Sequence, residues 1–261
     1  MYVNTTGLVL RETAYKESSK ILTVLTGGEG KLSVAAHGAL RRNSKLAAVT
    51  QLLAFSEMTL YMSKDRWTMT EARSVEQFIG LRDDIALLAL GAYCAELTEA
   101  VADEDSPNPE LLPLILNALF VLSEKIKAPE FVKPVFELRM MTIAGFEPLI
   151  SQCCECGRCD PKHAFLDLSG GTIKCADCSP TSANDGHIDP AASNNGATGA
   201  VALSGGALRA ANYIIGCDAK KLFSFTLGEA ALHELAVAAE GYLLAQLDRR
   251  FRTLDYYKGI R

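Results

Sequence analysis

Six of the chain's eight cysteines lie between Cys153 and Cys178, and four of them form two C-x-x-C pairs. Cys153 pairs with Cys156, and Cys175 pairs with Cys178 after a gap of 18 residues. Each C-x-x-C turn places two thiolates on one side of a tight loop, so two such turns can surround one metal ion tetrahedrally. A site with four thiolate ligands has no position for a substrate water. The spacing therefore predicts one structural Zn²⁺ per chain.

The ligand set leaves alternatives, because Cys154 and Cys159 lie beside the four paired cysteines. Cys156 and Cys159 also form a C-x-x-C pair, so one of the extra cysteines could replace a ligand. Free thiols, or a finger that packs without metal, are further interpretations of this segment. Cys94 and Cys217 lie in or beside helical patterns, which favours a role as small hydrophobic core residues.

The histidines, serines and glycines do not form a known catalytic motif. His233 lacks the second histidine that a zinc protease helix requires four residues later. The sequence has no glycine-rich phosphate or dinucleotide loop, no serine nucleophile turn and no base-deaminase motif. We therefore expect a protein that is not an enzyme.

Residues 1–78 are β-rich. They also carry an excess of basic residues, which the strands and loops of this segment must position. Five short strands are expected at 7–12, 20–26, 31–36, 55–62 and 66–72. The glycine-rich stretch 27–30 predicts a hairpin between the second and the third strand. Ser44 could cap a short helix at 46–53. Five strands with a helix between the third and the fourth is the order of an OB-type barrel.

The net charge of −5 is distributed unevenly along the chain. Residues 1–78 hold ten Lys and Arg against seven Asp and Glu, whereas residues 79–145 hold five against eleven. A polyanion would therefore be attracted to the N-terminal segment. The candidate DNA-binding residues are Arg11, Lys16, Lys20, Lys31, Arg41, Arg42 and Lys45. The alternative is that these are ordinary solvated charges.

The pattern after Phe78 changes to helical periodicity. Helices are predicted near 81–101, 111–127, 131–144, 204–216 and 227–250. The spacing Thr226-x-x-Glu229 predicts a capping box at the last of them. The predicted fold is α+β and multi-domain. Its expected parts are an OB-fold at 1–78, a helical domain at 79–150 and 203–261, an inserted zinc module at 151–180 and a flexible linker at 181–202.

No part of the sequence suggests a membrane or secretory protein. No run approaches the roughly 20 apolar residues that span a bilayer. The N-terminus lacks a basic segment followed by an apolar one, which a signal peptide would require. We expect a cytoplasmic, nucleoid-associated protein.

An ordered set of segments resembles the bacterial recombination mediator family RecO. The segments that carry the resemblance are 8–26, 30–44, 145–149, the two C-x-x-C pairs and Gly170-Gly171. The family usually has a basic residue directly after a Gly-Ala pair, whereas here Leu40 separates Gly38-Ala39 from Arg41 and Arg42. The resemblance covers residues 3–178 and, more loosely, 203–256.

The resemblance implies an N-terminal OB-fold, a helical domain and an embedded zinc module. It also implies binding to single- and double-stranded DNA, annealing of complementary strands and a role in recombinational repair without catalysis. The implied partners are RecR, the C-terminal tail of single-stranded DNA-binding protein (SSB) and, indirectly, RecA. Because that tail is acidic and ends in an aromatic residue, its receptor needs a cation beside an apolar groove. Lys133 and Arg139, on one predicted helix, are the candidate cations.

Two other classes of function are compatible with a four-cysteine zinc site. One is a zinc-ribbon scaffold in transcription that does not contact DNA. The other is an NAD-dependent deacylase, which would need a glycine-rich dinucleotide loop near the N-terminus. The sequence contains no such loop.

Overall fold

The computed structural model describes residues 1–104, 106–179 and 199–260. The chain is divided into two units, one formed by Met1–Ile126 with Phe251–Arg261 and the other by Lys127–Arg250. Among the helices within the described ranges, none is both long enough and apolar enough to cross a membrane.

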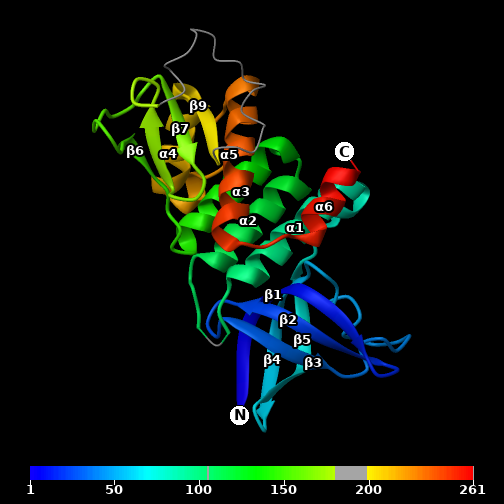
Figure 1. Cartoon of the computed structure of the whole chain (residues 1–261). Coiled ribbons are helices and arrows are strands. Elements are labelled where there is room, and N and C mark those ends of the chain that lie inside the picture. Colours follow the sequence, from blue (N-terminus) through cyan, green and yellow to red (C-terminus); the bar gives the residue numbers. More distant parts are fainter. Residues whose placement is uncertain (105, 180–198, 261) are drawn as a thin grey trace. The chain divides into compact units, whose positions relative to one another are not determined.

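Five strands of the first unit form a closed barrel (Figure 1). They are β1 (Tyr2–Tyr15), β2 (Ser19–Thr26), β3 (Lys31–Ala36), β4 (Phe55–Ser63) and β5 (Arg66–Glu76). Their order is β1-β2-β3-β5-β4, and every pair is antiparallel except β3 with β5. Inward-facing side chains such as Val9, Leu22, Val34, Leu60 and Trp67 form the core. The predicted OB-like barrel is confirmed.

Tight turns set the register of the strands. Gly30 follows the β2–β3 turn at a φ of 72°, where a Cβ atom would be strained and would lie 2.8 Å from the carbonyl oxygen of Ser106. Lys64 and Asp65 both have positive φ angles between β4 and β5. A two-residue hairpin turn of this kind matches the twist of the strands it joins.

The segment expected to form a helix at 46–53 folds as consecutive turns instead. Ser44 Oγ does accept a hydrogen bond from the Leu46 amide, as a helix cap would. The amide of Leu53, however, donates to the carbonyl of Val9, and the amide of Val9 donates to the carbonyl of Ala54. These bonds attach the end of the segment to β1, so a regular helix does not continue.

Three α-helices and one 3-10 helix complete the first unit. They are η1 (Ile79–Asp83), α1 (Ile85–Val101), α2 (Leu111–Ser123) and α6 (Arg252–Gly259). Asp84 caps α1 by accepting a hydrogen bond from the Ala86 amide at 2.7 Å. The sequence pattern does not reveal α6, which packs against α1. There Glu96 accepts a hydrogen bond from the amide of Thr253 at 3.0 Å.

The second unit combines helices with a four-stranded sheet. Its elements are α3 (Pro129–Ile143), β6 (Leu149–Cys153), β7 (His163–Asp167), β8 (Thr172–Cys175), β9 (Ala200–Ser204), α4 (Gly205–Gly216), η4 (Ala219–Lys221) and α5 (Glu229–Leu247). The sheet order is β6-β8-β7-β9. Antiparallel pairing of β9 with β7 therefore joins the strand before α4 to the cysteine segment.

Three boundaries differ from those expected. The linker expected at 181–202 ends earlier, because pairing with β7 orders β9 from Ala200 onward; residues 180–198 lie outside the described ranges. The last long helix begins after Gly228, and its N-cap has no side-chain hydrogen bond, so the predicted capping box at Thr226 does not form. The same helix ends at Leu247, because Asp248 adopts a left-handed backbone conformation at a φ of 44°.

Candidate metal centre and nucleic-acid interface

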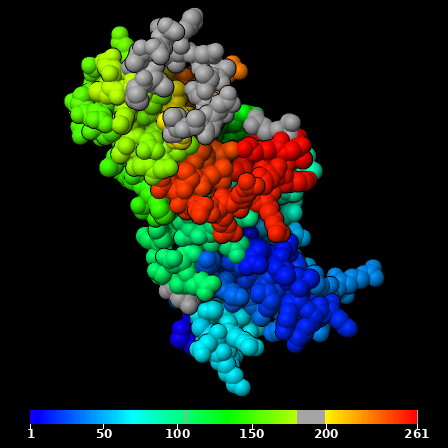
Figure 2. Space-filling view, in the orientation of Figure 1, coloured from blue at the N-terminus to red at the C-terminus, as the bar shows by residue number. Residues whose placement is uncertain are grey.

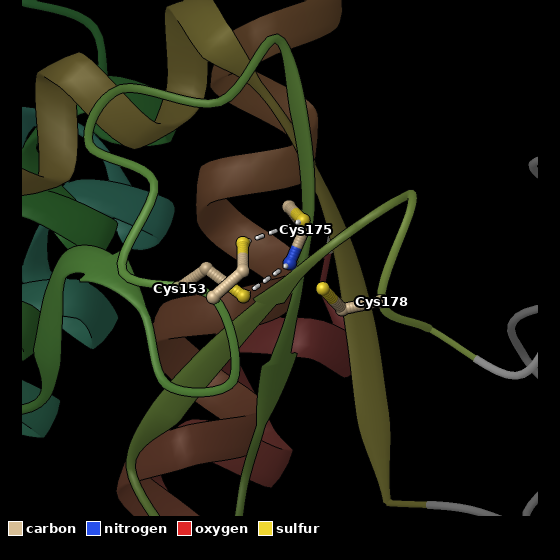
Figure 3. A group of neighbouring side chains, drawn as sticks. Cys153, Cys175 and Cys178 are labelled. Atoms are coloured by element: carbon tan, nitrogen blue, oxygen red, sulfur yellow. Dashed lines mark hydrogen bonds between the residues drawn. The ribbon is translucent and has the colours of Figure 1, made fainter.

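Two tight turns of the second unit bring four cysteines together. Their sulfur atoms all lie within 4.8 Å of one another: Cys153, Cys156, Cys175 and Cys178. The first cysteine of each pair ends a strand, β6 or β8, and is buried, whereas the second lies in the turn that follows. Because β6 and β8 are neighbours in the sheet, the two turns face each other. Figure 3 shows three of the sulfurs pointing toward one centre.

Hydrogen bonds already distinguish the four thiols. Backbone amides of Cys156 and Cys175 donate to the sulfur of Cys153 and lower the pKa of this thiol to about 6. The pKa of Cys178 is raised to about 12, because its thiol shares hydrogen bonds with Cys156 and Cys175. The group therefore combines a stabilised thiolate with a thiol that retains its proton, and a bound cation would displace that proton.

Two ion pairs outside the sulfur cluster connect its turns. Lys174 Nζ lies 2.7 Å from a carboxylate oxygen of Glu155, and this pairing lowers the pKa of Glu155. Arg158 is paired with Asp177 in the same way across the two turns. These four residues were not identified from the sequence. The signal that would have found them is one acidic residue inside each C-x-x-C pair and one basic residue just outside each pair.

The remaining cysteines lie apart from this group. Cys154 and Cys159 are exposed and do not belong to the set of converging sulfurs. Cys94 is fully buried in α1, as expected of a small hydrophobic residue. Cys217 is half-buried after α4, and burial raises the pKa of its thiol.

Four of the seven candidate DNA-binding residues lie at one end of the barrel, which we call the basic end: Lys16, Arg41, Arg42 and Lys45. The amide of Leu40 donates to the carbonyl of Ser18 at 3.0 Å, which places the basic loop beside the β1–β2 turn. All four side chains are exposed, and within the described residues no carboxylate forms an ion pair with them. Figure 2 shows both loops, in dark and light blue, projecting into solvent.

The other three candidates make internal contacts. Arg11 Nε lies 2.9 Å from a carboxylate oxygen of Glu99 in α1. Lys20 is largely buried and is paired with Glu12. Lys31 Nζ donates to the carbonyl oxygen of Glu99 at 3.0 Å, at the C-terminal end of α1. Their ammonium and guanidinium groups therefore have partners within the first unit.

The two residues considered for the SSB tail are also internally paired, in the second unit. Lys133 is buried between Glu137 of α3, at 2.8 Å, and Glu240 of α5, at 2.7 Å. Burial opposes the charge of Lys133, but the two carboxylates outweigh it and raise the pKa of this lysine. Arg139 donates to the carbonyl oxygens of Ile214 and Ile215 at the end of α4. Neither side chain is presented to a peptide, so this geometry does not support them as its receptor.

Comparisons with known proteins match two family models to the chain, and the boundary between the models falls just after the barrel strand β5. The N-terminal model of recombination protein O matches residues 1–78, and its C-terminal model matches residues 82–255. The chain belongs to the RecO family. Family membership makes it a DNA repair protein, and the segments that resemble the family lie in both matched regions.

Individual relatives support the RecO assignment along the whole chain. A DNA repair protein RecO from Acetivibrio thermocellus is 33% identical over 260 residues, which cover 99% of this chain and 97% of the relative. The RecO protein of Caldicellulosiruptor bescii is 30% identical over 259 residues, which cover 99% of both chains. A RecO protein from Listeria monocytogenes is 34% identical over 172 residues, covering 66% of this chain and 67% of the relative.

Proposed function

We propose that this RecO protein binds single- and double-stranded DNA without sequence specificity, anneals complementary strands and helps to load recombinase onto SSB-coated DNA. The observation that carries the proposal is the basic end of the barrel. Four exposed cations from two adjacent loops have no ion-pair partner in the described part of the chain. Their charge therefore remains available for phosphate groups.

Annealing requires two polyanions to approach each other while their bases stay free to pair. Lys and Arg side chains on phosphates reduce the repulsion between the strands, whereas contacts to base edges would compete with pairing. An exposed basic loop beside a hairpin turn offers phosphate contacts of this kind. This is the chemistry that a strand-annealing mediator needs.

A strand-annealing assay with SSB-coated complementary oligonucleotides tests the proposal. The unaltered chain is expected to accelerate annealing, and the Arg41→Ala/Arg42→Ala/Lys45→Ala variant is expected to lose most of this effect. Gel shifts with random-sequence single strands separate a DNA-binding mediator from a zinc-ribbon scaffold and from a deacylase. If the unaltered chain produces neither a shift nor annealing, the proposal is wrong.

We also propose that the four-cysteine cluster holds one structural Zn²⁺. A tetrahedral ion with Zn–S bonds of about 2.3 Å requires sulfurs about 3.8 Å apart. The sulfurs of Cys156 and Cys175 are 3.7 Å apart, which matches this spacing, and all four sulfurs lie within 4.8 Å of one another. Bound zinc would connect the two turns and supply folding free energy to a segment with a small apolar core.

The proposed protein partners are RecR, SSB and, indirectly, RecA. For the acidic SSB tail we propose a receptor in the second unit. It consists of two neighbouring aromatic rings and two exposed lysines of the adjacent 3-10 helix. The rings of Tyr213 and Phe225 lie 5.1 Å apart, and Tyr213 is 36% exposed. Lys220 and Lys221 are exposed in the adjacent η4. This group combines the apolar surface and the positive charge that such a tail requires.

Fluorescence anisotropy with a labelled tail peptide tests this receptor. The Lys220→Glu/Lys221→Glu variant is expected to bind the peptide about tenfold or more weakly, because each charged hydrogen bond contributes about 1.5–3 kcal/mol. Lys162→Glu, at another exposed position of the same unit, is the matched control. Equal peptide affinity for the double variant and the control would remove the receptor from this surface.

A further inference from the structure

The outer face of β1, β4 and β5 carries a groove of about 610 Å³. Strand register arranges its outward side chains in rows across the three strands. Asn4 is opposite Thr59, and Thr6 is opposite Glu57, which in turn is opposite Arg73. The hydroxyl of Thr59 donates to the side-chain oxygen of Asn4 at 2.9 Å. We call this surface the β1–β4–β5 face.

Two tyrosines extend the rows of this face beyond one end of the groove. Tyr2 on β1 is directly opposite Tyr61 on β4, and their ring centroids lie 4.8 Å apart at an interplanar angle of 41°. Tyr2 is 68% exposed, which is an unusual position for an aromatic ring in a strand. The pair therefore presents two tilted aromatic rings, with the Thr59 hydroxyl and the Asn4 amide in the next row of the face.

Positive charge lies next to the tyrosines, whereas the groove holds charges of both signs. Lys64 in the β4–β5 turn and Arg66 at the start of β5 are exposed, three and five residues after Tyr61 in sequence, with Asp65 between them. No ion pair involves either cation within the described residues.

Glu71 is opposite Thr59, one row away from the tyrosines, and Glu57 is opposite Arg73 in the next row. The groove itself therefore holds two carboxylates against one cation, which disfavours phosphates there. A polyanion would therefore run along the tyrosine end of this face.

We propose that the β1–β4–β5 face binds single-stranded nucleic acid by stacking bases on Tyr2 and Tyr61, with phosphates directed toward Lys64 and Arg66. The inference rests on the proposed DNA-binding function and assigns it a second contact surface. Stacking on a side chain requires an unpaired base, because bases in a duplex already stack on each other. This face thus selects single strands, whereas the basic end contacts phosphates of either form.

The face is separate from the basic end. Tyr2 begins β1, and the β1–β2 turn that carries Lys16 follows Tyr15 at the other end of the strand. A rise of about 3.4 Å per residue puts on the order of 40 Å of strand between them. Figure 1 shows the N-terminal end of β1 beside the cyan β4–β5 hairpin. Variants of the two surfaces can therefore be compared with little direct coupling.

The test compares the full-length Tyr2→Ala/Tyr61→Ala variant with the unaltered chain, using fluorescence anisotropy with a mixed-sequence single strand and the matching duplex. Affinity for the single strand is expected to fall about five- to tenfold or more, while affinity for the duplex stays the same. Tyr2→Phe/Tyr61→Phe is expected to retain binding, because stacking does not need the hydroxyl groups. Tyr256→Ala, at a 54% exposed position on α6, is the control.

Tyr2→Ala alone keeps the test informative if the double variant folds poorly, because the Tyr2 ring is mostly exposed. This single variant is also expected to bind the single strand more weakly. Unchanged single-strand affinity, or an equal loss for single strand and duplex, overturns the inference while leaving the proposed function intact. If the unaltered chain binds no DNA of either form, both the proposed function and this inference are wrong.

Discussion

Glu99, near the end of α1, contacts two basic residues of the barrel. Its carboxylate pairs with Arg11, and its carbonyl oxygen accepts a hydrogen bond from Lys31. Lys31 therefore places its charge at the C-terminal end of a helix, where carbonyl groups lack intrahelical partners. By contrast, Arg41 and Arg42 are exposed. The same type of side chain has a structural role at one position and remains available for a ligand at another.

The salt dependence of DNA binding should separate these two roles. Each phosphate neutralised on a single strand contributes about −0.7 to the slope of log K against log salt concentration. Replacing Arg41, Arg42 and Lys45 by alanine is therefore expected to reduce the slope by about 2, with little change in thermal stability. Lys31→Ala is expected to leave the slope unchanged and to lower the free energy of unfolding by about 1 kcal/mol.

Anisotropy titrations over a salt series, together with calorimetry of each variant, provide both measurements. An unaltered slope in the triple variant would contradict phosphate binding at the basic end. A smaller slope in Lys31→Ala would show that this lysine also contacts DNA.

Single cysteine substitutions address the metal site. Cys156→Ser should abolish tight zinc binding, because it removes one of four converging thiols. Cys159→Ser is the matched control, since this cysteine is exposed and lies outside the cluster. Elemental analysis of protein purified without chelator is expected to find about one zinc per chain in the control and far less in Cys156→Ser. Loss of zinc from Cys159→Ser would contradict the ligand assignment.

At the level of elements, polar side chains of α3 connect this helix to α4 and α5 of the second unit. Lys133 connects α3 to Glu240 of α5, while Arg139 of α3 supplies donors to the end of α4. Glu137 is completely buried beside Lys133. A helix with this many buried positions is amphipathic only weakly, so its periodicity does not show which of its charges are internal.

The buried charges of α3 and α5 should depend strongly on one another. Lys133→Ala leaves the carboxylate of Glu137 without this cation in a buried position and is expected to cost about 3–5 kcal/mol of unfolding free energy. The Lys133→Met/Glu137→Leu double variant should recover much of that loss, because it removes both charges and keeps the apolar volume. Denaturant unfolding of the two variants checks the difference. Equal stability of Lys133→Ala and the unaltered chain would contradict a buried ion pair.

At the level of the whole molecule, the proposed DNA-contact surfaces and the proposed metal site lie in different units. The basic end and the β1–β4–β5 face belong to the unit formed by Met1–Ile126 with Phe251–Arg261, and the cysteine cluster belongs to Lys127–Arg250. Trp67, the chain's single tryptophan, lies in the barrel core and is 8% exposed. Its fluorescence therefore reports on the first unit alone.

Removal of zinc should affect the two units differently. A chelator is expected to lower the thermal midpoint of the second unit, because metal binding contributes to the folding free energy of that unit only. The transition followed by Trp67 fluorescence should keep its midpoint, and single-stranded DNA should still bind. Calorimetry with and without chelator, compared with the fluorescence transition, checks this expectation. An equal shift of both transitions would contradict separate stabilisation of the two units.

The sequence by itself determined the features that depend on local pattern. Alternating residues and the glycine-rich turn at 27–30 predicted the barrel strands, and helical periodicity predicted most helices. Two C-x-x-C pairs predicted the cysteine cluster, because the geometry of each turn is set within four residues. The same local logic found the basic loop at Arg41 and Arg42.

Tertiary structure alone decided the features that depend on partners distant in the chain. The segment 46–53 does not form a regular helix because its last amide, that of Leu53, donates to the carbonyl of Val9 in β1. β9 is ordered by pairing with β7, and α6 is placed against α1, which are partners that no local pattern specifies. The charge of Lys133 is internal because a carboxylate 107 residues away meets it. Short-range periodicity carries no information about such encounters, so only the folded chain assigns these residues their roles.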